Sequence, residues 1–230
     1  AGGFAFFAKN ISGAKQLRTF TQALKNSSEI FPFIAVDEEG GQISRLANSK
    51  KLNFKKSQKF ESVAKIAEKN QSREAGKIIG TYLKDFGFNF DFAPVADVNT
   101  NSENIVIGDR AFGNKPDFVS KNVSEFLDGL HSAGVLGCLK HFPGHGDTKG
   151  DTHKDSVNVF KTWVELLKAE IIPFKKNLDK ADFVMTAHII MKNIDGKEAT
   201  LSRELVTEKL RKYLKYDGLI ITDAMMMKSI

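Results

Sequence analysis

The sequence lacks long apolar runs, and it holds only one cysteine. No stretch of about 18 consecutive apolar residues occurs, so we expect no membrane-spanning helix. The single thiol, Cys138, can form neither an internal disulfide nor a zinc–thiolate cluster, which fits a reducing cytoplasm. There is also no G-x-G-x-x-G segment after the first predicted strand and no Walker A motif, so nucleotide binding has no support from sequence motifs.

The composition is that of a globular protein. Of the 230 residues, 41% are hydrophobic and 27% are charged, which is enough for one large domain with a buried core. The net charge is +6, but the lysines and arginines are scattered and interleaved with acids. Nucleic-acid binding needs basic residues clustered on one face, so we expect none. A weak attraction for an acidic small molecule remains possible.

Short apolar runs alternate with helical patterns along the chain, which predicts parallel βα units. The runs are almost continuously apolar, as strands covered on both faces must be. Helical spacing of apolar residues is clearest at 14–27, 72–87, 115–134, 162–178 and 202–215. Six strands are predicted, at 2–8, 31–37, 86–95, 134–142, 181–190 and 217–224.

Polar residues at the ends of these strands distinguish the two architectures that parallel βα units can build. In a (β/α)8 barrel all carboxyl strand ends meet at one mouth, where barrel active sites lie, whereas an open doubly wound sheet spreads them along an edge. We therefore predict an α/β fold of the (β/α)8 TIM-barrel type, incomplete here because only about six units are visible. The residues at or after the strand ends are Asp37, Asp97, Lys140, His141, His188 and Asp223.

The loop "KHFPGHGDTKGDTHKDS" at 140–156 concentrates ionisable groups among glycines. In it, Asp151 precedes His153 by two residues, so the carboxylate can hold one ring nitrogen while the other exchanges a proton near neutral pH. The alternatives are a metal site and a plain solvated loop. His141 and His145 have helical spacing, but Pro143 lies between them and no H-E-x-x-H motif is present.

Four residues outside the Asp151–His153 pair are further candidates for a site. Asp223 follows a strongly apolar strand and can be a nucleophile or base at the barrel mouth, or only a helix N-cap. Asp37 begins a turn with two glycines, and Arg110 lies in the turn "GDRAFG". Lys140 ends an apolar strand, where a cation is costly unless it faces the mouth.

Together these stretches resemble a known family. "KHFPGHGDT" followed by Asp-x-His, with "AVDEEGGQISRL", "FAPVADVNTN", "IGDRAFG" and "GLIITDAMMM", resembles the bacterial β-N-acetylglucosaminidases of glycoside hydrolase family 3. The match covers nearly the whole chain, in the family's order. The resemblance implies a single catalytic barrel domain over 1–230. It also leads us to expect that the first strand and the last βα unit of that domain lie outside the chain.

The resemblance also implies a retaining mechanism and a role for each residue. Asp223 matches the nucleophile that forms a glycosyl-enzyme, His153 matches the general acid/base, and Asp151 matches the carboxylate that orients His153. The positions that bind the sugar hydroxyls are matched by Asp37, Arg110, Lys140 and His141. Most retaining glycosidases instead use two carboxylates.

The expected activity is therefore that of a cytoplasmic exo-β-N-acetylglucosaminidase. We expect a monomer that acts on peptidoglycan-derived muropeptides and needs neither a cofactor nor a metal, with no nucleic-acid or membrane partner. Two alternatives remain: a metal-dependent barrel hydrolase that uses the loop from His141 to His153, and an inactive fragment that only binds sugar. Loss of activity with a chelator would identify the first alternative.

Overall fold

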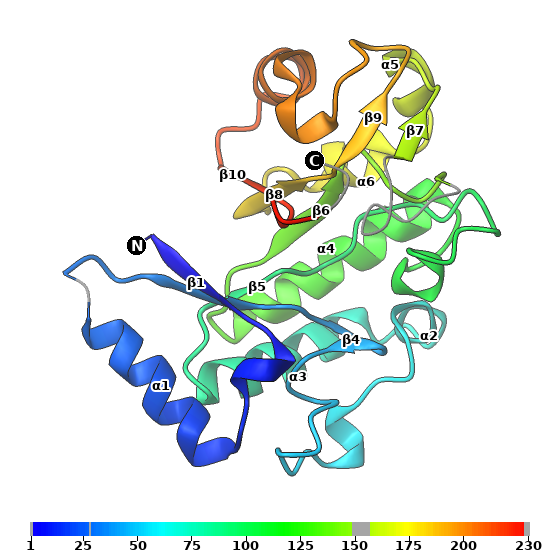
Figure 1. The fold of residues 1–230 in the computed structure, drawn as a ribbon. Coiled ribbons are helices and arrows are strands. Elements are labelled where there is room, and N and C mark those ends of the chain that lie inside the picture. The colour runs from blue at the N-terminus through cyan, green and yellow to red at the C-terminus, as the bar shows by residue number, and fades with distance from the viewer. Residues whose placement is uncertain (1, 28, 149–156, 228–230) are drawn as a thin grey trace. The chain divides into compact units, whose positions relative to one another are not determined.

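The computed structural model describes residues 2–27, 29–148 and 157–227 (Figure 1). These residues belong to two compact units. The first unit takes its residues from 1–94 and 125–137, and the second takes them from 95–124 and 138–230. Within the described ranges, no helix is both long enough and apolar enough to cross a bilayer.

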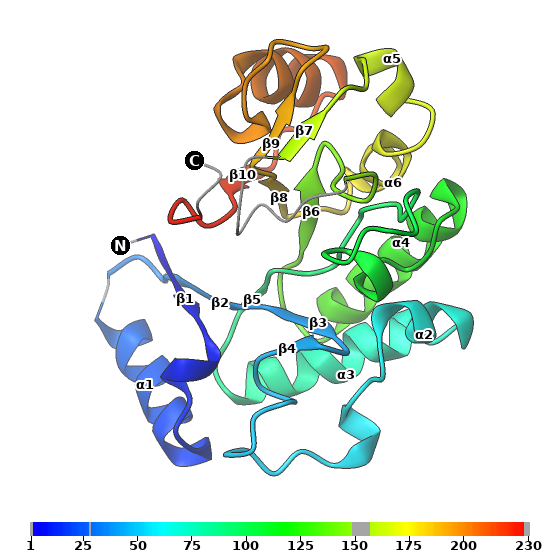
Figure 2. The ribbon, with the colours of Figure 1, turned by 45° about the vertical axis from the view of Figure 1, so that its right-hand side comes forward.

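The first unit is built on a parallel sheet whose strands follow one another in chain order. Its order is β1-β2-β5, with Phe4 opposite Ile34 and Val36 opposite Asp91 (Figure 2). A short antiparallel pair follows β2. The strands of this unit are β1 (Gly3–Phe6), β2 (Phe33–Val36), β3 (Glu38–Gly40), β4 (Ile43–Ser44) and β5 (Phe90–Asp91).

Apolar side chains from the strands and helices of the first unit form its core. Ile34 and Val36 have no exposed surface, and the rings of Phe6 and Phe88 pack edge to face at 5.1 Å. The helices of this unit are α1 (Ala14–Asn26), α2 (Val63–Glu68) and α3 (Ser72–Asp85), with short turns η1 (Ala8–Asn10) and η2 (Lys56–Gln58). Gly87 ends α3 with φ +88°, and the N–H of Phe88 reaches the carbonyl of Leu83 at 2.9 Å.

Glycines allow α3 to pack closely against the C-terminal half of α4 (Pro116–Ser132). A Cβ atom on Gly129 would lie 2.3 Å from the carbonyl oxygen of Arg73 and 2.6 Å from the backbone nitrogen of Lys77. A Cβ atom on Gly76 would lie 2.2 Å from the carbonyl oxygen of Phe126. Backbone atoms cannot rotate away as side chains can, so the two helix backbones would have to separate to admit a methyl group.

We expect Gly129→Ala to destabilise the protein by about 1–3 kcal/mol, the usual cost of overpacking. The measurement is the free energy of unfolding in urea. Gly2→Ala is the matched control, since a Cβ atom there meets nothing within 4 Å. Equal stability of the two variants would contradict the close approach of α3 and α4.

The second unit has its own parallel sheet, again with strands in chain order. The order is β6-β8-β10. Val184 of the central strand lies opposite Leu139 of β6 on one side and opposite Ile220 of β10 on the other. A separate parallel pair, β7 with β9, follows β6 and β8 in the chain. The strands are β6 (Cys138–Phe142), β7 (Val157–Val159), β8 (Phe183–Thr186), β9 (Ile189–Met191) and β10 (Leu219–Thr222).

Helical segments connect the strands of the second unit. Thr162 caps α5, accepting the N–H of Glu165 at 3.3 Å. Ser202 likewise accepts the N–H of Leu205 at 2.9 Å near the start of η5, a helix of π type. The segments are η3 (Gly108–Arg110), the N-terminal half of α4, α5 (Trp163–Leu166), α6 (Ile171–Asn177), η4 (Ala199–Leu201) and η5 (Glu204–Tyr213).

Three predicted elements differ from the structure. The strand expected over 181–190 is divided into β8 and β9, which belong to different sheets. The helix expected over 162–178 is divided into α5 and α6, which places Pro173 in the first turn of α6, where the lack of an N–H is tolerated. The strand expected over 86–95 pairs continuously only at Phe90–Asp91, with one further parallel bridge between Val95 and Lys140. Pro94, which cannot donate to a ladder, interrupts it.

The prediction of an α/β chain with parallel strands is confirmed. All six predicted strands are present, and in each of the two three-stranded sheets the neighbours follow one another along the chain. Among the described residues these strands form separate sheets and not one closed ring.

Candidate active site

Two of the predicted sugar-binding residues lie on β6 of the second unit. Lys140 and His141 are 2% and 6% exposed, and the carbonyl of Lys140 accepts the N–H of Ala96 at 2.7 Å. The peptide bonds Lys140–His141 and Phe142–Pro143 are both cis. Lys140 and His141 are thus buried polar residues within an otherwise apolar strand.

Asp97 determines the orientation of His141. The Oδ2 atom of Asp97 lies 2.6 Å from Nδ1 of His141, and Asp97 has no exposed side-chain surface. Its Oδ1 atom accepts the backbone N–H of His141 at 3.2 Å and that of His145 at 2.7 Å. A carboxylate can only accept, so Nδ1 of His141 carries a proton and Nε2 is left to face a ligand.

The ring of His145 lies against a hydroxyl group. Its Nδ1 lies 2.9 Å from Oγ1 of Thr148, and its carbonyl accepts the side-chain N–H of Asn104 at 2.8 Å. Burial, and then the charge of His141, lower the pKa of His145 to about 4. His145 is therefore neutral at neutral pH and serves the structure of the loop. In the described part of the chain, no group of three or more His, Cys, Asp or Glu side chains is arranged to hold a metal ion.

Arg110 lies at the end of η3 in the same unit. Its Nη1 donates to the carbonyl of Val106 at 3.0 Å, which fixes the base of the guanidinium within its own turn. The positive charge of Arg110 contributes to the low pKa of His145, so the two groups are near each other. The structure therefore places Arg110 near His145, and its expected role in binding stays a prediction.

Asp223 follows the carboxyl end of β10. Its N–H donates to the carbonyl of Thr186 at 3.1 Å, and its Oδ1 accepts the N–H of Ala224 at 2.7 Å. Asp223 is thus aligned with the end of β8 by the backbone, and one of its carboxylate oxygens is fixed by the next peptide group.

Positive charge surrounds the Asp223 carboxylate. Burial raises its pKa and is the largest single influence, but His141 and the N–H of Ala224 lower it. Lys140 and His188 act in the same direction, so the net effect is a pKa below the ordinary value of 3.8. Asp223 is ionised at neutral pH, in the state that a nucleophile or an electrostatic stabiliser needs. The structure thus brings together Lys140, His141 and Asp223, which lie far apart in the sequence.

Asp37 lies in the first unit, immediately after β2. Its carbonyl accepts the N–H of Arg45 at 3.2 Å, and its Oδ2 lies 3.6 Å from Nη2 of Arg45. The next residue, Glu38, is fully buried and accepts the N–H groups of Leu46 and Ala47 at 2.8 and 3.0 Å. Glu38 thereby fixes the turn that carries Arg45 next to Asp37.

The environment of Glu38 makes its charge depend on pH. Burial raises its pKa to about 7, although the N–H groups of Leu46 and Ala47, the hydroxyl of Tyr82 and the charge of Arg45 all lower it. The Tyr82 hydroxyl donates to Oε1 at 2.8 Å. Because the folded pKa exceeds the ordinary 4.5, the stability that Glu38 contributes is present below pH 4.5 and is lost as pH rises through 7.

We expect the cost of Glu38→Gln to be larger at pH 5 than at pH 8, by about 2–3 kcal/mol, because glutamine does not titrate. The measurement is the free energy of unfolding of both proteins in urea at the two pH values. Comparing variant with wild type cancels the titration of all other groups. A difference that does not change with pH would mean that Glu38 has an ordinary pKa.

The two remaining predicted catalytic residues, Asp151 and His153, lie outside the described residues. Their expected roles as orienting carboxylate and general acid/base stay predictions.

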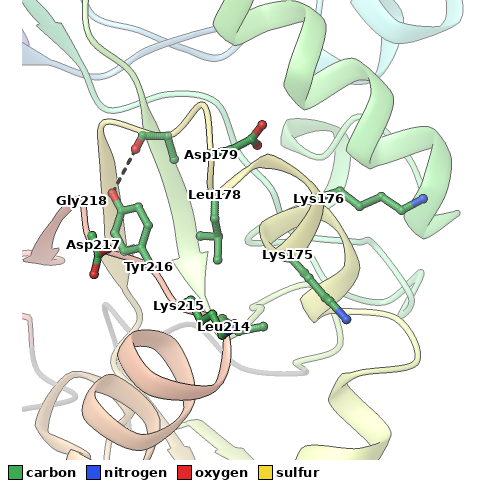
Figure 3. Close-up of a pocket in the computed structure, with 10 residues that line it drawn as sticks. Lys175, Lys176, Leu178, Asp179, Leu214, Lys215, Tyr216, Asp217 and Gly218 are labelled. Atoms are coloured by element: carbon green, nitrogen blue, oxygen red, sulfur yellow. Dashed lines mark hydrogen bonds between the residues drawn. The ribbon is translucent and has the colours of Figure 1, made fainter.

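A cavity of about 640 Å³ in the second unit lies at the other ends of the strands (Figure 3). Its lining comes from the segments before β8 and β10, and Tyr216 lies across it with its hydroxyl 3.2 Å from the carbonyl of Ala181. Lys175 and Lys215 line it together with Asp217, so charges of both signs are present. Ligands of α/β proteins bind at carboxyl strand ends, where Lys140, His141 and Asp223 lie, so we do not assign the site to this cavity.

Sequence reasoning gave no role to three residues that the structure connects to the candidate site. Asp97 and His188 were noted as polar residues at or near the ends of predicted strands, and this position was the signal that the sequence offered. Their hydrogen-bond partners could not be predicted. Arg45 follows Asp37 by eight residues in the sequence "DEEGGQISR", and the two glycines indicated a turn. A tight turn brings the residues after it back beside the residues before it, so the sequence carried a signal for the pairing of Arg45 with Asp37.

A family model matches the chain over its whole length. Residues 1–230 fit the description "Glycosyl hydrolase family 3 N terminal domain". The chain belongs to glycosyl hydrolase family 3. This confirms the resemblance that the loop at 140–156 and the segments around Asp37, Arg110 and Asp223 indicated.

Individual relatives of this family 3 chain carry consistent names. It is 32% identical to "Beta-hexosaminidase A" of Pseudoalteromonas piscicida, covering 100% of this chain and 42% of the relative. A solved family 3 β-N-acetylglucosaminidase from Paenibacillus sp. str. FPU-7 superposes with a TM-score of 0.91 at 33% identity, covering 100% of this chain and 44% of that one. NagZ from Neisseria gonorrhoeae in complex with N-trifluoroacetyl-D-glucosamine gives 0.86 at 28% identity, covering 96% and 66%.

The family 3 chain thus spans less than half of the first two relatives and about two thirds of the third. The structural match extends over both units. The family assignment therefore applies to the whole chain, while the activity of the relatives belongs to longer proteins.

Proposed function

We propose that this chain carries the catalytic site of a retaining exo-β-N-acetylglucosaminidase. The observation that carries the proposal is Asp223, an ionised carboxylate at a carboxyl strand end, beside the buried Lys140 and His141 of β6. The names of the relatives, beta-hexosaminidase and β-N-acetylglucosaminidase, support the sugar, and the N. gonorrhoeae protein was solved with a derivative of glucosamine.

In the first step, a lone pair of the Asp223 carboxylate attacks the anomeric carbon of the terminal N-acetylglucosamine. The bond from that carbon to the glycosidic oxygen breaks, and the oxygen leaves with the bonding electrons. It takes a proton from His153, whose other ring nitrogen is held by Asp151. The low pKa of Asp223 keeps the nucleophile ionised at the pH where a histidine can still be protonated.

In the second step, water hydrolyses the glycosyl-enzyme. Neutral His153 removes a proton from the water, and the water oxygen attacks the anomeric carbon from the face opposite Asp223. The carbon–oxygen bond to Asp223 breaks, which restores the carboxylate. Two inversions give net retention at the anomeric carbon, as in retaining glycosidases with two carboxylates.

The sugar hydroxyls are bound by Asp37, Arg110, Lys140 and His141 in this proposal. Asp97 supports His141 by accepting its Nδ1–H, which leaves Nε2 for a hydroxyl. Lys140 is buried, and its charge favours both a polar sugar and an ionised Asp223.

The proposal also includes the barrel fold, the substrates, the oligomeric state and the cellular location that the sequence led us to expect. The chain forms most of a (β/α)8 barrel, since neighbouring strands follow chain order in both sheets, as they do in a barrel. The substrates are muropeptides derived from peptidoglycan, whose carboxylates suit the net charge of +6. The enzyme acts as a monomer in the cytoplasm, where a protein with one cysteine needs no disulfide.

The test is hydrolysis of 4-nitrophenyl N-acetyl-β-D-glucosaminide by the full chain, with the 4-nitrophenyl β-D-glucoside as the matched control. Proton NMR at early times identifies the first-formed anomer of the product. We expect release of β-N-acetylglucosamine, no comparable glucoside cleavage, and no effect of a chelator. The α-anomer as first product, or loss of activity with the chelator, would contradict the proposed mechanism.

A further inference from the structure

His188 lies just after β8, is 1% exposed, and has a partner at each ring nitrogen. Its Nε2 atom is 3.2 Å from the carbonyl oxygen of Ala224, the residue after the proposed nucleophile. A carbonyl oxygen only accepts hydrogen bonds, so Nε2 carries a proton in this arrangement. The other nitrogen, Nδ1, is 2.9 Å from Oγ1 of Thr200.

The hydroxyl of Thr200 can serve either charge state of His188. It lies 3.0 Å from Oγ1 of Thr186 and 3.0 Å from the carbonyl of Ala187. When His188 is neutral, Thr200 donates to Nδ1 and can accept from Thr186. When His188 is a cation, Nδ1 donates to Thr200, whose proton turns to the carbonyl of Ala187. The bond from Nε2 to Ala224 is kept in both states.

The hydrogen bond from Nε2 of His188 to the carbonyl of Ala224 affects the orientation of the Asp223 carboxylate. The N–H of Ala224 donates to Oδ1 of Asp223 at 2.7 Å, and the N–H of Asp223 is held by the carbonyl of Thr186 at 3.1 Å. The chain at Asp223 is therefore fixed on its N-terminal side by β8 and on its C-terminal side by His188. Among the described residues, Oδ2 of Asp223 has no hydrogen-bond donor, so the two oxygens are not equivalent.

We propose that His188 is a positioning residue for the nucleophile, and that Oδ2 is the oxygen of Asp223 that attacks the sugar. By holding the carbonyl of Ala224, the imidazole fixes the segment whose N–H occupies Oδ1, and so directs Oδ2 to the anomeric carbon. The inference rests on the proposed function, since it assigns a role in the attack of Asp223.

The imidazole also belongs to the group of charges that act on Asp223. Lys140 and His141 on β6 act on the carboxylate together with His188, and all three stabilise its ionised form. Replacing His188 by a neutral residue therefore removes part of the positive potential, so the pH at which Asp223 becomes ionised rises. A side chain that only fills space would not have this effect.

The experiment compares His188→Leu with His188→Gln. Glutamine places its side-chain N–H close to the position of Nε2 and can donate to Ala224, whereas leucine cannot. The rate of glycosyl-enzyme formation is measured in a single turnover with an activated aryl β-N-acetylglucosaminide from pH 3 to 8. The melting temperature of each protein is measured as well.

We expect His188→Leu to slow glycosyl-enzyme formation by about 100-fold, the cost of a displaced reacting group. His188→Gln should recover to within about tenfold of wild type. In both variants the acidic limb of the pH profile should move to higher pH. If both variants fold, lose the same activity and keep the wild-type acidic limb, His188 only packs and the inference is wrong.

A second pair of variants covers the case in which His188→Leu does not fold. Thr200→Val removes the partner of Nδ1 with little change of shape, and Thr200→Ser keeps the hydroxyl. We expect about tenfold slower glycosylation for valine and near wild-type rates for serine. Equal rates for the two would overturn the inference. A wild-type protein that forms no glycosyl-enzyme would instead overturn the proposed function, and the inference with it.

Discussion

Asp223→Ala is expected to reduce kcat for N-acetylglucosaminide hydrolysis by about 10⁴-fold or more, since it removes the proposed nucleophile. The remaining site, with Lys140 and His141 in place, should still bind the sugar. The measurement is kcat and KM with 4-nitrophenyl N-acetyl-β-D-glucosaminide. Asp217→Ala is the matched control, because Asp217 is an exposed aspartate before β10 and lies at the opposite end of that strand.

Azide can replace the lost carboxylate and so identify its role. In Asp223→Ala, azide enters the vacated space, attacks the anomeric carbon directly and gives the α-glycosyl azide by a single inversion. In a His153 variant, azide would instead intercept the glycosyl-enzyme and give the β-azide by two inversions. Formation of the β-azide by Asp223→Ala would contradict the assignment of Asp223 as nucleophile.

Asp97→Asn is expected to lower kcat/KM by about 10- to 100-fold, the cost of losing one hydrogen bond to a charged group in a buried site. The backbone can be preserved, because the amide oxygen can take the place of Oδ1 and accept the N–H groups of His141 and His145. The amide NH₂ then faces Nδ1 of His141. To accept from it, the ring must move its proton to Nε2, so the atom facing the ligand changes from acceptor to donor.

The tautomer of His141 can be observed directly. Nitrogen-15 chemical shifts of the ring distinguish protonated Nδ1 from protonated Nε2, and we expect the change on going from wild type to Asp97→Asn. Asp179→Asn is the control for charge, since Asp179 is exposed and lines the cavity at the other strand ends. An unchanged tautomer together with unchanged kcat/KM would show that Asp97 does not orient His141 for binding.

The parallel α/β fold could be predicted because its strands are apolar throughout and its helices have clear spacing. The division of the segment 162–178 could not be predicted from spacing alone, because apolar residues recur on both sides of Pro173. The shortness of β5 had a similar origin: the run 86–95 stays largely apolar on both sides of Phe90–Asp91, and Pro94 cannot donate to a ladder. In both segments the side chains stay apolar because they are buried, even where the backbone no longer forms regular helix or strand hydrogen bonds.

The residues of the candidate site were predictable where they are polar exceptions at strand ends, as Lys140, His141 and Asp223 are. The contacts that support these residues could not be predicted from the sequence. The contact between Asp97 and His141 joins residues 44 positions apart, and that between His188 and Ala224 joins residues 36 apart. Which nitrogen of a histidine is protonated depends on such contacts, and they become visible only in three dimensions.

The central claim is that Asp223 forms a covalent bond to N-acetylglucosamine, and mass spectrometry tests it most directly. The full-length, folded protein is treated with a fluorinated N-acetylglucosaminyl fluoride, which forms the glycosyl-enzyme faster than water removes it. The tryptic peptide "YDGLIITDAMMMK", residues 216–228, is then sequenced. We predict one sugar adduct, located on Asp223. An adduct on another residue, or none on protein that is shown to be folded and to cleave the aryl glycoside, would contradict the claim.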